Sequence, residues 1–126
     1  MDVIKKADLK KNAVDHPYDS NPDYIAKVNM FYYSEDNKFA AGYWEAPVGW
    51  FNATIKGFNE LDLIIEGEIE AVSEDKVNTV IAKKGDIFAI KDGDRFLWKV
   101  TQPTKALFFI YPLTPDLKDF FDSLIM

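Results

Sequence analysis

Residues 59–68 read NELDLIIEGE, which indicates a strand, a tight turn at Glu66-Gly67 and the start of a second strand. Side chains two positions apart on a strand point to the same face. The aliphatic residues at positions 61, 63 and 65 would therefore cover one face, while Glu60, Asp62 and Ile64 would cover the other. A small closed barrel explains both faces, because one packs under neighbouring sheet and the other lines a cavity.

Short apolar segments lie on both sides of this stretch and are separated by Gly, Pro, Asn and Asp, the residues typical of turns. Eight or nine strands with such turns predict an all-β sandwich or barrel. The predicted strands cover residues 24–33, 39–45, 50–56, 60–65, 68–73, 77–82, 87–90, 96–100 and 105–111.

Residues 1–23 are predicted to form an N-terminal arm. A charged stretch leads into a loop rich in Pro and Asp, which resists regular structure. Such an arm can lie along a sheet edge and cover it. His16, the one histidine, lies in this loop. We expect it to be an exposed loop residue rather than a base.

The tail, residues 114–126, is predicted to be an amphipathic helix. Thr114 is suited to cap it and Pro115 to occupy its first position. Apolar residues follow at helical spacing, so one stripe is apolar. We expect the helix to dock on the outside of the barrel rather than on a membrane or a partner. The chain is thus one domain, residues 1–126, with the arm at 1–23, the barrel at 24–112 and the helix at 114–126.

Composition narrows the function classes. The 126 residues carry a net charge of −6, which disfavours nucleic acid and anionic membranes as partners. There is no cysteine, which removes disulfides, thiolate metal sites and cysteine nucleophiles. No apolar run approaches the roughly 20 residues that cross a bilayer, and the polar start is no signal peptide. We expect a cytoplasmic protein.

Three segments resemble the cupin superfamily of small antiparallel β-barrels. Glu60 and, after six residues, Gly67 fit the second half of the first cupin motif. Gly85-Asp86 and Gly93 fit the glycine skeleton of the second. Tyr43-Trp44-Glu45 and Trp98-Lys99-Val100 narrow the likeness to compact cupins related to ureidoglycine aminohydrolase and to the bacterial ethanolamine-utilisation (EutQ-like) proteins. The resemblance covers about residues 39–112 and implies a jelly-roll barrel and a homodimer.

The metal ligands of the family are mostly missing. Metal-binding cupins place two histidines shortly before the motif glutamate. The candidate positions here are Ala53 and Ile55, or Thr54 and Lys56, depending on the length of the turn. Phe96 stands where the second motif has its histidine, so only Glu60 remains of four ligands. One carboxylate, even with Asp62, is too few for a tight transition-metal site, although magnesium or calcium bound by oxygen stays open. We expect no metal and no cofactor.

Glu60 and Asp62 are the candidate catalytic residues. Two carboxylates in one low-dielectric cavity cannot both stay charged cheaply, so the pKa of at least one should rise towards neutrality. Alternatively, Lys56 neutralises them, or hydroxyls such as that of Thr54 satisfy them. Flat aromatic walls with a few polar groups are typical of a small-molecule pocket, and equally of a barrel core. The candidate ligand-binding residues are Trp44, Trp50, Thr54, Lys56, Arg95, Phe96 and Trp98, with Arg95 placed to meet an anion at the mouth.

The leading hypothesis is a metal-independent cupin that binds a small molecule of unknown identity. The second is an enzyme of the aminohydrolase, lyase or isomerase type, in which Glu60 or Asp62 acts as general acid–base. The third is a structural or assembly module without a ligand, whose barrel would be filled. The fold alone does not choose among them.

Overall fold

The structure, a computed structural model, describes residues 1–125 of the chain. Within these residues it contains a short 3-10 turn, eight β-strands and one α-helix. In chain order they are η1 (Lys6–Asp8), β1 (Val14–Tyr18), β2 (Asn21–Tyr33), β3 (Ala40–Ala46), β4 (Gly49–Thr54), β5 (Asn59–Ser73), β6 (Thr79–Lys83), β7 (Ile87–Ile90), β8 (Arg95–Tyr111) and α1 (Pro115–Ile125).

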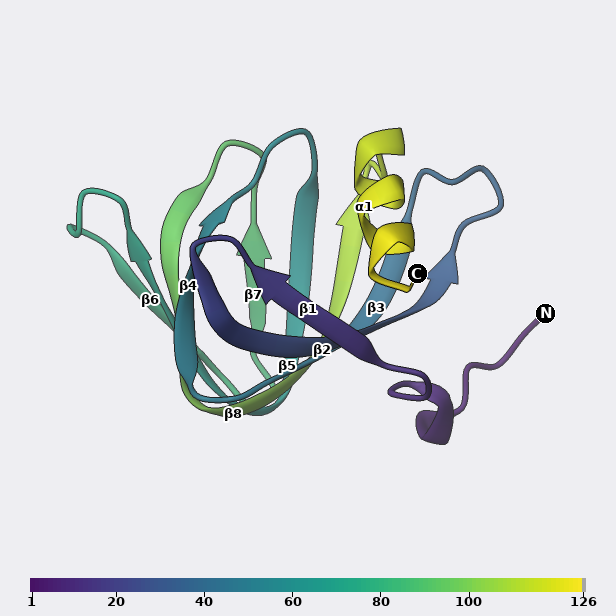
Figure 1. Cartoon of the computed structure of the whole chain (residues 1–126), viewed down its shortest axis with the longest axis horizontal. Coiled ribbons are helices and arrows are strands. Elements are labelled where there is room, and N and C mark those ends of the chain that lie inside the picture. The colour runs from purple at the N-terminus through teal and green to yellow at the C-terminus, as the bar shows by residue number, and fades with distance from the viewer. Residues whose placement is uncertain (126) are drawn as a thin grey trace.

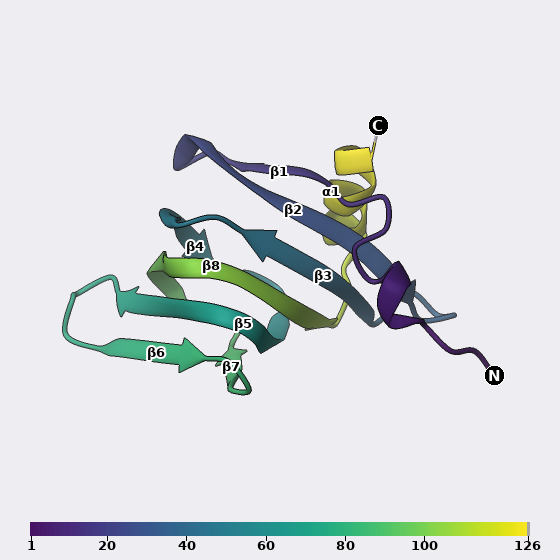
Figure 2. The ribbon, with the colours of Figure 1, turned by 90° about the horizontal axis from the view of Figure 1, so that it is seen from below.

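All strand pairs are antiparallel, and the order is β1-β2-β3-β8-β5-β6. The two remaining strands pair with the longest ones, β4 with β8 and β7 with β5. The sheet curls round an interior, as the curved band of ribbons in Figure 1 shows, and Figure 2 shows the same strands from below. The predicted small antiparallel barrel with a C-terminal helix is confirmed.

Strands β5 and β8 are continuous where the sequence predicted turns. Residues 66–67 and 101–104 do not end a strand, because pairing continues on both sides of them, for example between Glu66 and Lys105 and between Glu68 and Gln102. The register shifts around Gly67 instead, as at a β-bulge. A bulge bends a strand without ending it. The predicted strands 60–65 and 68–73 are therefore one long strand, β5, and the predicted strands 96–100 and 105–111 are one long strand, β8.

The N-terminal arm contains a strand that the sequence did not predict. Strand β1 pairs with β2 from Val14 opposite Val28 to Tyr18 opposite Asn21. Pro17 is tolerated because β1 is the outermost strand of the sheet order, and an edge strand can do without one ladder hydrogen bond. The side chains of Val14, His16 and Tyr18 are half-buried, whereas those between them are exposed. The arm thus adds a strand with one inward face.

Helix α1 begins as predicted. The Leu117 backbone N–H donates to the Thr114 hydroxyl at 3.2 Å, which caps the first turn. The predicted docking on the outside of the barrel is wrong, because Phe121 belongs to the barrel core and its ring stacks on that of Phe108, with centroids 6.1 Å apart. The apolar stripe of α1 therefore packs against the inward face of the curled sheet. Residue 126, the last of the predicted helix, lies outside the described residues.

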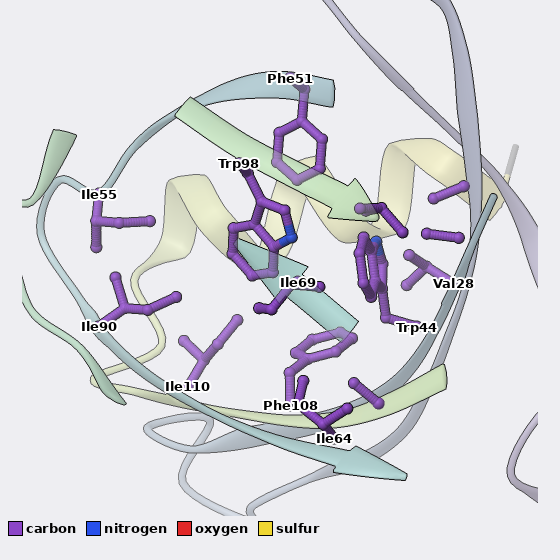
Figure 3. Close-up of a cluster of buried hydrophobic side chains, with 14 of the residues drawn as sticks. Val28, Trp44, Phe51, Ile55, Ile64, Ile69, Ile90, Trp98, Phe108 and Ile110 are labelled. Carbon is purple, nitrogen blue, oxygen red and sulfur yellow. The ribbon is translucent and has the colours of Figure 1, made fainter. Parts of the chain in front are cut away.

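The inward faces of the strands form one hydrophobic core. The parity of strand β4 is settled, since Phe51 and Ile55 are buried and Ala53 is half-buried between them, while Asn52 and Thr54 are exposed. Figure 3 shows Phe51, Trp98 and Trp44, from three different strands, pointing into the barrel interior. The odd-numbered residues of β4 therefore face inward, and both positions where metal-binding cupins would hold histidine are apolar.

Candidate functional site

A cavity of about 250 Å³ lies inside the barrel and beneath α1. Its walls come from β1 to β5, β8 and the helix, so segments from both ends of the chain meet there. The lining residues are His16, Tyr18, Val28, Trp44, Phe51, Asn52, Ala53, Thr54, Ile55, Phe58, Glu60, Asp62, Trp98, Phe108, Ile110, Leu117, Phe120 and Phe121. Most of these are apolar, which leaves the few polar side chains as the chemically distinctive part.

Glu60 and Asp62 lie side by side on the inward face of β5, and we call them the carboxyl pair. Their cross-strand neighbours on β8 are Ile110 and Phe108, so the pair sits against apolar surface. Asp62 is only 3% exposed. Burial raises the pKa of Asp62 well above its ordinary value, and the nearby Glu60 carboxylate raises it further. Burial also raises the pKa of Glu60, whereas its hydrogen bond with Asp62 acts to lower it. Ionisation of both carboxyls together is therefore disfavoured.

An aromatic wall faces the same cavity, formed by Tyr18, Trp44, Phe51 and Trp98. The rings are in contact, with centroids 3.9 Å apart for Tyr18 and Phe51 and 5.3 Å apart for Phe51 and Trp98. The Trp44 ring meets that of Trp98 edge to face at 5.5 Å. Such rings present flat, weakly negative faces to anything inside the cavity.

Two buried polar atoms of the lining have no hydrogen-bond partner among the described residues. They are Oδ2 of Asp62 and Nε1 of Trp98. By contrast, Nε1 of Trp44 donates to the Tyr18 hydroxyl at 2.9 Å. An unsatisfied buried donor or acceptor costs about 1–3 kcal/mol, so such atoms are uncommon unless something binds them.

The sequence-based prediction missed two residues of the site, His16 and Tyr18. His16 was predicted to be an exposed loop residue, but it is half-buried on β1 and lines the cavity. Its ring stacks on Tyr18 at 4.3 Å and meets Phe120 of α1 at 5.4 Å. Burial lowers the pKa of His16, which favours the neutral ring, and raises that of Tyr18, which keeps its proton. The alternation of residues 14, 16 and 18 was the available signal, but Pro17 obscured it.

The structure brings together five of the predicted site residues at the cavity, namely Glu60, Asp62, Trp44, Trp98 and Thr54. The other four lie elsewhere. Trp50 is 43% exposed and borders a shallow outer depression together with Val48 and Leu97. Lys56 is exposed, and Phe96 packs between Trp98 and Phe88.

Arg95 does not reach the cavity either. It is exposed and lies 3.7 Å from the Glu74 carboxylate, a surface ion pair between Nε and Oε2. The carboxyl pair has no ion pair with any Lys, Arg or His of residues 1–125, so the neutralisation by Lys56 that was considered from the sequence is not seen. No basic side chain of residues 1–125 therefore neutralises the carboxyl pair.

The residues present do not fit the metal site of metal-binding cupins. Besides Glu60 and Asp62, the positions that would supply ligands are the apolar Ala53, Ile55 and Phe96. Within residues 1–125, no three His, Cys, Asp or Glu side chains lie close enough to hold a metal ion. A tight transition-metal site takes three or four such donors. No chemistry is therefore assigned to a metal here.

An antiparallel barrel with a lined cavity, with Glu60 and Gly67 of the first motif on one of its strands, is typical of a cupin domain. The family model described as "Ethanolamine utilisation protein EutQ" matches residues 1–115, and the chain belongs to this family. The resemblance inferred from the two motifs is thereby confirmed.

Individual relatives agree with this assignment. The chain is 26% identical over 93 residues to the acetate kinase EutQ of Escherichia coli K12. The matched region makes up 74% of this chain and only 39% of that protein. The EutQ protein of Clostridium difficile superposes with a TM-score of 0.65 at 17% identity, covering 89% of this chain and 82% of the other. The ectoine synthase of P. lautus superposes with a TM-score of 0.74 at 13% identity, covering 97% of this chain and 86% of the other. At these identities the solved structures show a shared fold.

None of the helices in residues 1–125 has the length and apolar character needed to cross a bilayer.

Proposed function

We propose that this cupin domain binds a small molecule in its barrel cavity without the help of a metal. The carboxyl pair anchors the ligand and the aromatic wall covers it. One observation carries the proposal: Oδ2 of Asp62 and Nε1 of Trp98 are buried, unpartnered and part of the same cavity lining. A ligand that accepts from the indole N–H and binds the carboxyl oxygen would satisfy both.

The shape of the site supports the same proposal. Ligand sites are concave and mostly apolar, with a few convergent polar groups. Here apolar side chains from four strands and α1 surround two carboxyls, an indole N–H and the Tyr18 hydroxyl. The volume of about 250 Å³ suits a ligand of a few to about ten heavy atoms, because one water molecule takes about 30 Å³ of liquid.

Thermal unfolding in a library of small polar compounds tests this function. A compound that binds the folded state stabilises it by RT ln(1 + [L]/Kd), so the melting temperature rises with the logarithm of the ligand concentration. Ala53 lines the cavity, so Ala53→Leu should fill part of it and abolish the response. Ala89→Leu adds the same bulk at an exposed position of β7 and should leave it intact. A response that survives EDTA treatment supports metal independence, and a response that survives Ala53→Leu contradicts the proposed site.

A second candidate function is an enzyme of the aminohydrolase, lyase or isomerase type. It is favoured by the raised pKa of Asp62 and its hydrogen bond with Glu60, because a carboxyl that holds its proton can act as general acid–base. Glu60→Gln keeps the shape but removes the proton acceptor. It should abolish turnover while a ligand still binds, whereas a pure binding protein would show no turnover to lose.

Two further properties belong to the proposal. We expect the domain to act in the cytoplasm and to form a homodimer, as its resemblance to compact cupins implied. Sedimentation of the full chain would test the dimer, with a monomer mass at micromolar concentration as the contrary result.

A further inference from the structure

We propose that the ligand of the cavity is a small protonated amine, whose ammonium group lies between the carboxyl pair and the aromatic wall. This inference rests on the proposed function and specifies the chemical class of the ligand. The charge of the cavity, the unpartnered oxygen and the aromatic faces support it independently of one another.

The charge of the cavity comes first. Glu60 and Asp62 are the acidic groups of the lining, and a cation placed beside them would favour their ionised, negatively charged form. No Lys, Arg or His of the described residues forms an ion pair with it. The other titratable lining groups are His16 and Tyr18 of β1, both favoured in their neutral forms. The lining residues of β4, β8 and α1 are uncharged. A cation would therefore be attracted and an anion repelled.

The unpartnered oxygen sets the hydrogen-bonding chemistry. Oδ2 of Asp62 is buried without a partner and Asp62 is 97% buried by area, since only 3% is exposed. A carboxyl oxygen without a partner can accept a hydrogen bond from any N–H or O–H group that reaches it. An ammonium group offers N–H donors, which form short, strong bonds with carboxyl oxygens. A quaternary ammonium has no such donor and would leave this oxygen unsatisfied.

The aromatic faces supply the remaining contacts. Tyr18, Trp44, Phe51 and Trp98 come from four different strands and line the cavity that the carboxyl pair also lines. Figure 3 shows the rings of Trp44, Phe51 and Trp98 at the interior. The face of such a ring attracts a cation, and desolvation strengthens the attraction. The cavity is small, so the amine should carry only a short tail, and the unpartnered indole N–H of Trp98 calls for a hydrogen-bond acceptor on that tail.

Calorimetry with four simple probes tests the class of ligand. The full chain is titrated at pH 7 and constant ionic strength with n-butylammonium, n-butanol, butyrate and tetramethylammonium. Saturable binding of n-butylammonium, at least tenfold tighter than that of n-butanol or tetramethylammonium and with no binding of butyrate, would support the inference. The alcohol tests the need for charge and the quaternary cation tests the need for an N–H donor.

A matched pair of variants locates the binding. Asp62→Asn is a neutral isostere and should weaken n-butylammonium at least tenfold. Glu66→Gln removes a carboxylate from an exposed position of the same strand, where it lies 3.6 Å from Lys105, and should leave the affinity within twofold. Equal losses in the two variants would show attraction by the net surface charge and would overturn the site.

Proton release gives a readout that needs no variant. An ammonium group favours the fully ionised carboxyl pair, so binding should release a fraction of a proton. The release appears as a dependence of the binding heat on the ionisation enthalpy of the buffer. Binding without proton exchange would contradict the assignment, even if Asp62→Asn failed to fold.

The remaining outcomes separate this inference from the proposed function. Binding of n-butanol as tight as that of n-butylammonium overturns the amine while leaving a small-molecule site. Binding of butyrate in preference to both does the same. If none of the four probes binds and no compound of the library raises the melting temperature, both proposals fail.

Discussion

Replacing Gly67 by Ala should remove a large part of the stability of this domain. Gly67 marks the bulge of β5 and has φ +91, in the region that favours glycine. A Cβ atom there would lie 2.3 Å from the Pro103 carbonyl oxygen and 2.8 Å from Cα of Thr104. Both are backbone atoms of the adjacent β8, so the contact cannot be relieved by turning a side chain.

The magnitude follows from two contributions. A side chain at positive φ costs about 1–2 kcal/mol, and overpacking against fixed atoms costs about 1–3 kcal/mol. Gly67→Ala should therefore lower the free energy of unfolding by about 2–5 kcal/mol, a large share of the 5–15 kcal/mol typical of a domain. Gly93 has φ +96, and a Cβ atom added there would meet nothing within 4 Å, so Gly93→Ala should show only the first contribution, about 1–2 kcal/mol.

Urea unfolding followed by far-UV circular dichroism measures both variants. The slope of free energy with urea should stay unchanged, so that the shift in midpoint reports stability alone. Equal losses for Gly67→Ala and Gly93→Ala would refute the argument, because the close approach of β5 and β8 would then contribute nothing.

Three other predictions address the site and its helix. The folded state holds the Asp62 proton more tightly than the unfolded state. The free energy of unfolding should therefore fall as pH rises above the ordinary Asp pKa of 3.8 and through the raised pKa. Urea unfolding at several pH values should show this fall in the wild type and lose it in Asp62→Asn. Phe121→Ala should cost about 3–5 kcal/mol because Phe121 is 6% exposed, and Phe120→Ala, at 43% exposure, clearly less; equal midpoints in urea would contradict the docking of α1. Thr114→Ala should cost about 1 kcal/mol through the lost cap, with an unchanged melting temperature as the contrary result.

The barrel could be predicted from the sequence because each strand leaves a local signal, namely short apolar segments separated by turn residues. Alternation placed Glu60, Asp62 and Ile64 on one face, and the structure buries Asp62 and Ile64 and half-buries Glu60 there. The turn at Glu66-Gly67 was wrong because glycine marks a bulge as readily as a turn. Only the pairing with a distant strand, here β8, distinguishes the two.

The site was predicted in part for the same reason. Trp98 and the carboxyl pair lie on strands whose parity the motifs set, and they line the cavity. Trp50 does not line it, and the length of the turn before Glu60 had left the parity of β4 open. His16 and α1 reach the cavity only through long-range packing, His16 against Phe120 and Phe121 against Phe108. Local periodicity can show that a side chain faces inward, but not which distant side chain it meets.

The most direct test of the account is a carboxyl ¹³C NMR titration of the full chain, with Asp62 assigned from Asp62→Asn. The account predicts that Asp62 stays protonated well above its ordinary pKa of 3.8, and that Glu60 and Asp62 titrate as a coupled pair that responds to n-butylammonium. Independent titration of both groups near 3.8 and 4.5, insensitive to the amine, would contradict a buried carboxyl pair facing a ligand cavity.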